Sequence, residues 1–220
     1  MSENPHFQKE VFLRSEGDKW FLRNQSSFLE REFPDLSLVA EYVAPSKYSQ
    51  QNPLSLLEIG SGAGDRLAFL CNLLTATGIG IEPSELATKI ANQTFHDQGC
   101  QYLQGTSDDL PFNDNSFDLV FFGFCLYLID RSLVDQTINE ADRVLKKGGF
   151  LAIIDFDPPT DMQNPYIHYN GIISFKMQYW KLFLPKDYEL VMKLSLSESG
   201  DIAFERDENK RTSICLLYKR

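Results

Sequence analysis

Residues suited to binding metal ions are scarce in this sequence of 220 residues. It has only three histidines, and its four cysteines are scattered with no pair at metal-ligand spacing. We therefore predict no metal site. Scattered cysteines are typical of free thiols in a reducing compartment, so we expect a cytoplasmic protein.

Long apolar segments are also missing. The longest uncharged apolar stretch runs from Leu119 to Ile129, whereas a helix that spans a membrane needs about 20 apolar residues. Residues 1–10 have neither the basic start nor the apolar core of a signal peptide. The sequence thus predicts no membrane partner.

Positive charge is low as well, since 21 basic residues stand against 31 acidic ones and the net charge is −10. A protein that binds nucleic acid usually has a basic stripe, because each phosphate contact needs Lys or Arg. Short basic pairs such as Lys146-Lys147 do not form such a stripe. We expect no nucleic-acid partner.

Two regions with different patterning divide the chain. Residues 1–53 lack the alternating apolar and polar pattern of strands, and we predict that they form a helical cap. In that cap, Ser15–Asp18 has capping-box spacing before an apolar helical face, and 36–43 is expected to form a second short helix. Residues 54–220 alternate between strands and helices and are expected to form the main domain, with an aromatic-rich lid at about 157–185.

The main domain predicts a doubly wound α/β fold, because buried strands alternate with helices before a final β-hairpin. We expect a seven-stranded, mostly parallel sheet with a C-terminal antiparallel hairpin. Ser84 would cap a helix, and Asp118 would anchor the start of a strand by bonding backbone. The expected strands are 54–59, 77–81, 100–103, 117–122, 150–156, 188–196 and 212–219, and the expected helices are 66–74, 84–98 and 131–145, the last ended by Gly148-Gly149.

A glycine-rich turn follows the first expected strand, with Gly60, Gly62 and Gly64 spaced as G-x-G-x-G. Glycine permits the sharp bends and the close approach of a ligand that such a turn needs. Glu82 ends the second strand, where an acid in doubly wound folds binds ribose hydroxyls. A dinucleotide would need G-x-G-x-x-G, and Asp65 would repel its pyrophosphate. S-adenosylmethionine (SAM), a sulfonium cation without phosphate, fits better; a tight turn without a ligand and a solvated Glu82 are the alternatives.

The surrounding motifs resemble those of class I SAM-dependent methyltransferases of the methyltransferase-11 type. They occur in the order and at the spacing of that family. Leu56–Gly64 is similar to motif I, 80–84 to the acidic ribose loop, 110–120 to the LPF…FDLV block, and 143–149 to the RVLKPGG turn with Lys147 in place of proline.

The resemblance implies transfer of a methyl group from SAM and suggests which residues bind it. Gly60 and Gly62 would approach the amino-acid part of SAM, Glu82 would bind the ribose, and the loop after the third strand would meet adenine. Because Thr106-Ser107 stands where the family commonly has Asp-Ala, Asp108 is an alternative adenine contact. The other candidates for cofactor binding are Glu58, Ser61, Gly64, Pro83 and Phe124.

A cluster in the expected cap also has the composition of a ligand site. Trp20, Arg23 and Asn24 lie three and four residues apart and so share one helical face. Arg can bind a carboxylate bidentately, and SAM carries one. The stretch Glu16–Asn24 resembles the entry segment of methyltransferases from bacterial surface-sugar pathways. An amphipathic helix with a solvated Arg23 is the alternative.

The acceptor of the methyl group is expected beyond the carboxyl ends of the strands, where the strand order reverses. His168 is the candidate general base, needed only if the acceptor loses a proton, and Asp157 is the second catalytic candidate. A structural role for His168 is the alternative. The sequence therefore predicts methyl transfer to a small polar acceptor, such as a sugar or nucleotide sugar of surface polysaccharide synthesis. A non-catalytic SAM-binding module and a methyltransferase acting on a protein remain open.

Overall fold

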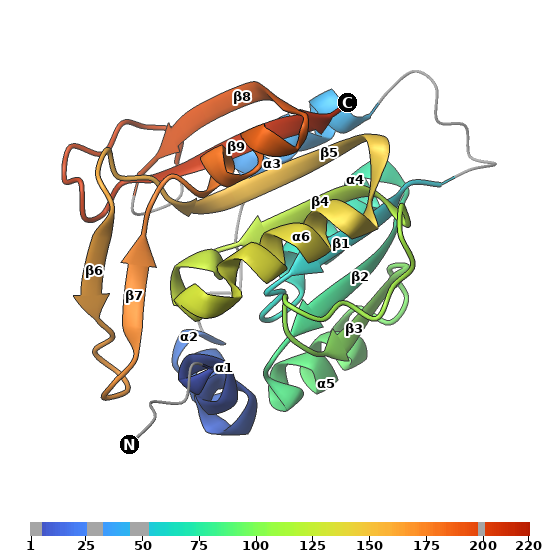
Figure 1. Ribbon diagram of the computed structural model, residues 1–220. Helices are drawn as coiled ribbons and strands as arrows, with labels where there is room; N and C mark the ends of the chain where they lie inside the picture. The colour runs from blue at the N-terminus through green and yellow to red at the C-terminus, as the bar shows by residue number, and fades with distance from the viewer. Residues whose placement is uncertain (1–5, 26–32, 45–52, 198–200) are drawn as a thin grey trace.

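The computed structural model describes residues 6–25, 33–44, 53–197 and 201–220. Within them, seven strands form one central sheet in the order β3-β2-β1-β4-β5-β9-β8, as Figure 1 shows. The first five are parallel, and β9 is antiparallel to both β5 and β8. The predicted sheet is thereby confirmed. Its strands are β1 (Ser55–Ile59), β2 (Thr77–Glu82), β3 (Cys100–Gln104), β4 (Phe117–Gly123), β5 (Leu145–Phe156), β8 (Tyr188–Leu196) and β9 (Thr212–Lys219).

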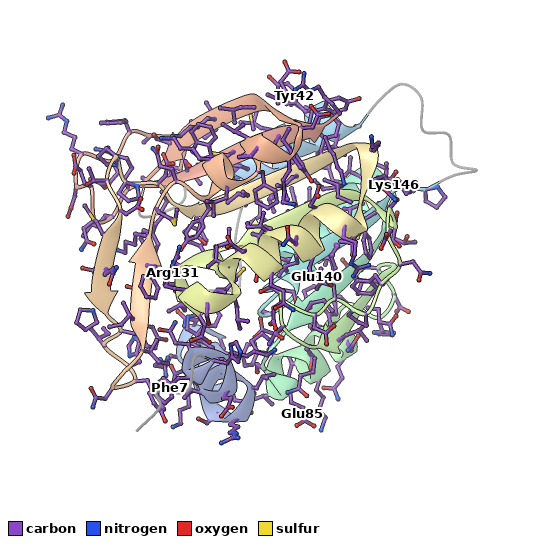
Figure 2. All side chains as sticks on the ribbon, viewed as in Figure 1. Phe7, Tyr42, Glu85, Arg131, Glu140 and Lys146 are labelled. Carbon is purple, nitrogen blue, oxygen red and sulfur yellow. The ribbon has the colours of Figure 1, made fainter. Side chains whose placement is uncertain are left out.

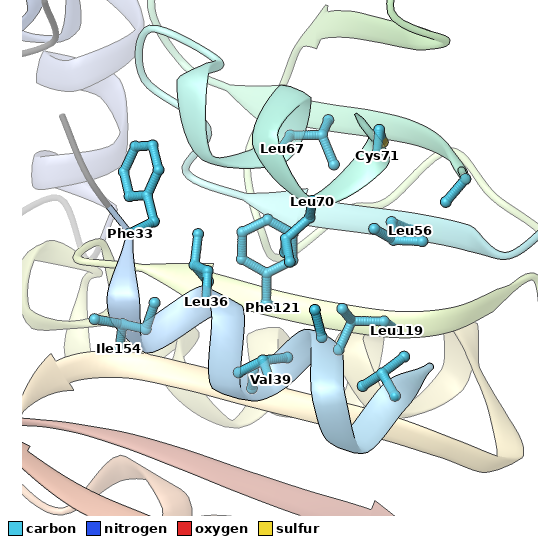
Figure 3. Packing of buried hydrophobic residues seen from close by; sticks show 14 of the residues in the cluster. Phe33, Leu36, Val39, Leu56, Leu67, Leu70, Cys71, Leu119, Phe121 and Ile154 are labelled. Carbon is cyan, nitrogen blue, oxygen red and sulfur yellow. The ribbon is translucent and has the colours of Figure 1, made fainter. Parts of the chain in front are cut away.

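Helices cover both faces of this sheet because neighbouring strand residues point to opposite sides. Leu56 of β1 packs in a cluster with residues of α3 and α4, and Figure 3 shows this packing from close by. Leu57, the next residue, packs in a second cluster with α6. A fully buried Leu contributes about 1.5–3 kcal/mol, so the two clusters make the sheet a rigid support for its loops. The helices are α3 (Pro34–Val43), α4 (Asp65–Leu74), α5 (Glu85–Thr94) and α6 (Val134–Val144).

The ends of two helices differ from the expectation. The helix expected over 84–98 ends at Thr94, because Phe95 leaves helical geometry and its ring packs on Tyr102. The helix expected to end at Gly148-Gly149 ends at Val144, because Leu145 already pairs with Phe117 in the sheet. The predicted N-cap role of Ser84 is confirmed, since the Ser84 hydroxyl accepts the Ala87 N–H at 3.0 Å.

The N-terminal helix begins earlier than the capping-box pattern predicts. It runs without a break through α1 (Phe7–Val11), a π-helical turn η1 (Phe12–Glu16) and α2 (Gly17–Asn24), so Ser15 lies inside the helix and caps nothing. The cap comes from Asp130, whose carboxylate accepts the N–H of Gln8 at 3.1 Å and of Lys9 at 2.7 Å. Residues 26–32 and 45–52 of the predicted cap region lie outside the described residues.

A β-hairpin that the sequence did not predict stands in the expected lid. It consists of β6 (Met162–Pro165) and β7 (Ile173–Lys176), and in Figure 1 it extends from the sheet towards α1. Two short 3-10 turns follow, η5 (Tyr179–Leu182) and η6 (Leu184–Lys186). In Figure 2, Phe7 lies near the end of this hairpin and Arg131 beside β7. The Phe7 and Tyr169 rings are 6.2 Å apart, so the N-terminal helix and the hairpin meet.

Candidate functional site

The glycine turn after β1 has backbone angles that favour glycine. The φ angles of Gly60, Gly62 and Gly64 are +78°, +50° and +84°, in the left-handed region. A Cβ on Gly60 would lie 2.5 Å from the Cβ of Cys125, so glycine also lets the loop after β4 approach the turn. Gly64 caps α4, and the Tyr102 ring fills the space where its Cβ would be. Gly64 therefore serves helix packing and does not line the cavity.

A cavity lies between this turn, the carboxyl ends of the strands and the N-terminal helix. Strand order reverses there between β1 and β4, the usual ligand position in open α/β sheets. Most of the predicted cofactor residues line this cavity: Trp20, Gly60, Ser61, Gly62, Glu82, Pro83, Thr106, Ser107, Asp108 and Phe124.

The Glu82 carboxylate is oriented by backbone. It accepts the Gly62 N–H at 2.9 Å and the Ser84 N–H at 3.0 Å, and it borders the cavity at the end of β2. Burial raises the pKa of Glu82 to about 7, and the two N–H donors oppose that rise only in part. A carboxylate held in this way can accept hydrogen bonds from a ligand without rearranging.

Several buried polar atoms near the turn lack a hydrogen-bond partner among the described residues. They are the Ser61 hydroxyl, Asp65 Oδ2 and both carboxylate oxygens of Glu58. Burial raises the pKa of Glu58 well above its ordinary value, and the charge of Arg66 only partly opposes this. Ser61 and Asp65 line the cavity, whereas Glu58 lies behind its wall. Unsatisfied groups of this kind are expected where a polar ligand binds.

The loop after β3 is tied to other segments. Lys9 of α1 forms an ion pair with Asp108 at 2.6 Å. Burial by itself would raise the pKa of Asp108, but hydrogen bonds from Lys9 and Thr106 together with the charge of Lys9 lower it. The hydroxyls of Ser107 and Thr137 are 2.8 Å apart. All three predicted adenine contacts, Thr106, Ser107 and Asp108, thus already have side-chain partners, and all three residues face the cavity.

The three cap residues are only partly brought to this cavity. Trp20 lies over the turn, with a ring carbon 3.6 Å from the position of a Gly62 Cβ. Arg23 instead donates to Glu16 and to the Tyr166 hydroxyl, and Asn24 donates to the Trp20 carbonyl at 2.8 Å. Arg23 and Asn24 do not line the cavity.

Replacing Arg23 by Lys tests this placement. The Arg23 guanidinium contacts Glu16 and Tyr166 and does not line the cavity. We therefore expect the free energy of SAM binding to Arg23→Lys to stay within about 0.5 kcal/mol of wild type. Isothermal titration calorimetry measures this. A tenfold weaker affinity would instead support the sequence-based role of Arg23 as the ligand of the SAM carboxylate.

The two predicted catalytic residues also lie outside the cavity lining. His168 is exposed in the turn of the β6–β7 hairpin, with its ring 5.2 Å from that of Tyr166. Asp157 is buried, pairs with Lys193 at 2.6 Å and accepts the indole N–H of Trp180 at 3.3 Å. Both side chains therefore have other contacts in this structure.

Asp118 has its expected structural role, since its carboxylate accepts the Ser55 N–H at 3.0 Å. Sequence reasoning missed Lys9, Phe12 and Asp130, which line the cavity from the N-terminal helix and from the loop before α6. No local pattern could have found them, because they reach the cavity through contacts between distant parts of the chain.

The described residues show two further features. None of their helices is both long and apolar enough to cross a membrane. No group of three or more His, Cys, Asp or Glu side chains among them could hold a metal ion.

Comparison with known proteins finds a similar domain in the central part of the chain. Residues 57–153 match the family model described as a methyltransferase domain. Over this range the chain is similar to methyltransferase domains, and its seven-stranded sheet has the class I fold expected from the sequence.

Among individual proteins, the ubiquinone/menaquinone biosynthesis C-methyltransferase UbiE of Pseudomonas entomophila is 32% identical over 112 residues, which cover 48% of this chain and 43% of that protein. The UbiE protein of Shewanella sp. (strain W3-18-1) is 29% identical over 148 residues, covering 64% and 54%. The chain spans about half the length of these curated relatives.

A solved structure shares the whole fold. It is the 1,6-didemethyltoxoflavin-N1-methyltransferase of Burkholderia thailandensis with bound 1,6-didemethyltoxoflavin and S-adenosylhomocysteine. The TM-score is 0.71 and the identity 12%, and the alignment covers 100% of this chain and 92% of that one. At this identity the likeness describes the fold alone.

Proposed function

We propose that this protein transfers a methyl group from SAM to a small polar acceptor. The observation that carries the proposal is the pair of carboxylates beside the glycine turn. Glu82 and Asp65 both line the cavity, and Asp65 Oδ2 has no partner among the described residues. A ligand with a sulfonium and an ammonium group suits this negative wall, whereas a pyrophosphate would be repelled.

The proposed contacts follow the walls of the cavity. Gly60 and Gly62 take the amino-acid end, with Ser61 as a further donor or acceptor and Trp20 above. Glu82 takes the ribose hydroxyls. Thr106, Ser107 and Asp108 face the adenine, and Pro83 and Phe124 supply apolar contacts on either side. Glu58 and Gly64 make no direct contact with SAM in this proposal: Glu58 is buried behind the cavity wall, and Gly64 lets α4 pack close to Tyr102.

Methyl transfer from SAM depends mainly on how the protein positions the two reactants. SAM supplies an activated methyl group, so the chain contributes chiefly by holding donor and acceptor in line. The acceptor would enter at the reversal of strand order, beside Phe124 and Cys125. A sugar or nucleotide sugar as acceptor, and a cytoplasmic location, stay predictions from the sequence.

Calorimetry tests the choice of cofactor. We expect SAM and S-adenosylhomocysteine to bind and NAD to give no heat, because the turn lacks the third glycine of a dinucleotide site and carries Asp65 beside it. Heat for NAD with none for SAM would overturn the assignment. Binding of SAM without S-adenosylhomocysteine release in an acceptor screen would favour a non-catalytic SAM-binding module.

A further inference from the structure

Arg66 is a basic residue in the cavity lining that the proposed contacts with SAM do not use. It is half-buried in the first turn of α4. Its guanidinium carbon is 5.6 Å from the centroid of the Phe124 ring, and its Nη1 would lie 3.4 Å from a Cβ on Gly123. Gly123 and Phe124 also line the cavity, at the end of β4. The guanidinium therefore lies in the part of the cavity where the strand order reverses.

This guanidinium is not bonded to a protein carboxylate. Among the described residues, the Arg66 side chain has no ion pair and donates no hydrogen bond. The carboxyl of Glu58 lies on the other side of Gly123, and burial raises its pKa well above the ordinary value, which favours the uncharged form. Lys9 also lines the cavity but is paired with Asp108 at 2.6 Å. Of the two basic residues in the described lining, Arg66 is thus the one available to an anionic group of a ligand.

The backbone donors of the glycine turn are already in use. The N–H groups of Gly60 and Ser61 both donate to the Ile81 carbonyl, at 2.8 Å and 3.1 Å. The N–H of Gly62 donates to the Glu82 carboxylate at 2.9 Å. At these positions the turn gives a ligand space but no free donor. A ligand carboxylate that leaves water beside the turn therefore needs a side-chain donor.

Asp65, the residue before Arg66, brings the opposite charge to the same cavity. Its Oδ2 is buried and has no hydrogen-bond partner among the described residues. The hydroxyl of Ser61, a residue that is only 3% exposed, also lacks a partner there. The amino-acid end of SAM carries an ammonium and a carboxylate group on one carbon. Neighbouring residues of opposite charge complement such a group, and Arg binds a carboxylate through two parallel hydrogen bonds.

We propose that Arg66 binds the carboxylate of SAM and that Asp65 Oδ2 accepts a hydrogen bond from its ammonium group. This rests on the proposed function and deepens it, since it names the side chains that hold the amino-acid end. Arg66 takes the role that the sequence predicted for Arg23, whose guanidinium is bonded to Glu16 and Tyr166 outside the cavity lining. The site should then discriminate against decarboxylated SAM, which keeps the sulfonium, ribose, adenine and amino group and lacks only the carboxylate.

The test measures the binding of SAM and of decarboxylated SAM by isothermal titration calorimetry. Wild type is compared with Arg66→Gln, which removes the guanidinium, and with Asp65→Asn, which removes the carboxylate. Arg14→Gln is the charge-matched control, because Arg14 is exposed, pairs with Glu10 at 3.3 Å and does not line the cavity. Melting temperatures without ligand are recorded for every protein, so that a folding defect is recognised.

We expect wild type to bind SAM at least about tenfold more tightly than decarboxylated SAM, because hydrogen bonds between charged groups are strong. In Arg66→Gln the SAM dissociation constant should rise by about tenfold or more, while that of decarboxylated SAM stays within about threefold. Arg66→Lys keeps the charge but loses the planar fork, so its SAM affinity should lie between those two proteins. Asp65→Asn should weaken both ligands by a similar factor, since both carry the ammonium group. Arg14→Gln should match wild type with both.

Equal affinity of wild type for the two ligands would overturn the proposal without any variant, so a variant that fails to fold does not leave it untested. Equal weakening of both ligands in Arg66→Gln would also overturn it, because Arg66 would then only support Phe124 and the turn. Unchanged SAM affinity in Arg66→Gln would overturn it in favour of an anionic group on the acceptor as the partner of Arg66. Failure of wild type to bind SAM would instead contradict the proposed function itself, so the failures are distinguishable.

Discussion

Glu82→Ala is expected to weaken SAM binding more than tenfold. A carboxylate that accepts two ribose hydroxyls makes charge-assisted hydrogen bonds, each worth about 1.5–3 kcal/mol. The substitution also frees the N–H groups of Gly62 and Ser84 that now bond to this side chain. Calorimetry with SAM measures the loss. Glu85→Ala is the control, because Glu85 is exposed at the start of α5, as Figure 2 shows. This variant should bind SAM like wild type.

The same residue should make SAM binding depend on pH. Burial raises the pKa of Glu82 to about 7, above the roughly 4.3 of a Glu in an unfolded chain. The group therefore favours the folded apoprotein most when protonated, and this contribution is lost as the pH rises from about 4 to 7. Ribose hydroxyls donate to the ionised form, so affinity should rise between pH 6 and 8 and then level off.

Glu82→Gln isolates this effect, because it keeps every other titrating group, including Asp155, whose pKa burial also raises to about 7. The difference in binding free energy between wild type and Glu82→Gln should grow over that pH range. An identical pH profile for both proteins would mean that Glu82 does not bind the ribose, and that it serves only to bond the turn.

Gly64→Ala is expected to lower the free energy of unfolding by about 2–4 kcal/mol, which combines backbone strain with overpacking. The φ angle is +84°, and the new Cβ would lie 2.6 Å from the Tyr102 ring. That ring cannot simply move, because its hydroxyl donates to the Gly64 carbonyl at 2.7 Å. In a chain of this size the melting temperature should fall by roughly 5–15 °C.

Gly148→Ala separates the two causes. Gly148 has a similar φ of +79°, but the nearest atom to its added Cβ is 3.7 Å away. It should therefore cost only the strain, about 1 kcal/mol, in urea or thermal unfolding. Equal losses for both variants would show that φ alone governs the turn and that the contact with Tyr102 contributes nothing.

Local patterns in the sequence determined most of the sheet and the centre of the cofactor cavity. Apolar runs placed all seven strands, and glycine spacing together with Glu82 located the turn that lines the cavity. The Ser84 cap was also predictable, because its partner lies only three residues away. Each of these signals depends on residues that are close in the chain, so the sequence pattern alone carries it.

Only the tertiary structure decided how the N-terminal helix and the hairpin complete the site. The start of α1 depends on Asp130, more than one hundred residues away, so a local capping box could not locate it. Tyr166 of the lid hairpin hydrogen-bonds to both Arg23 and Glu16 of the N-terminal helix. Asp157, just after β5, pairs with Lys193 of β8, which is two strands away in the sheet, beyond β9. In each case the partner comes from a distant segment, and only folding brings the two groups within reach.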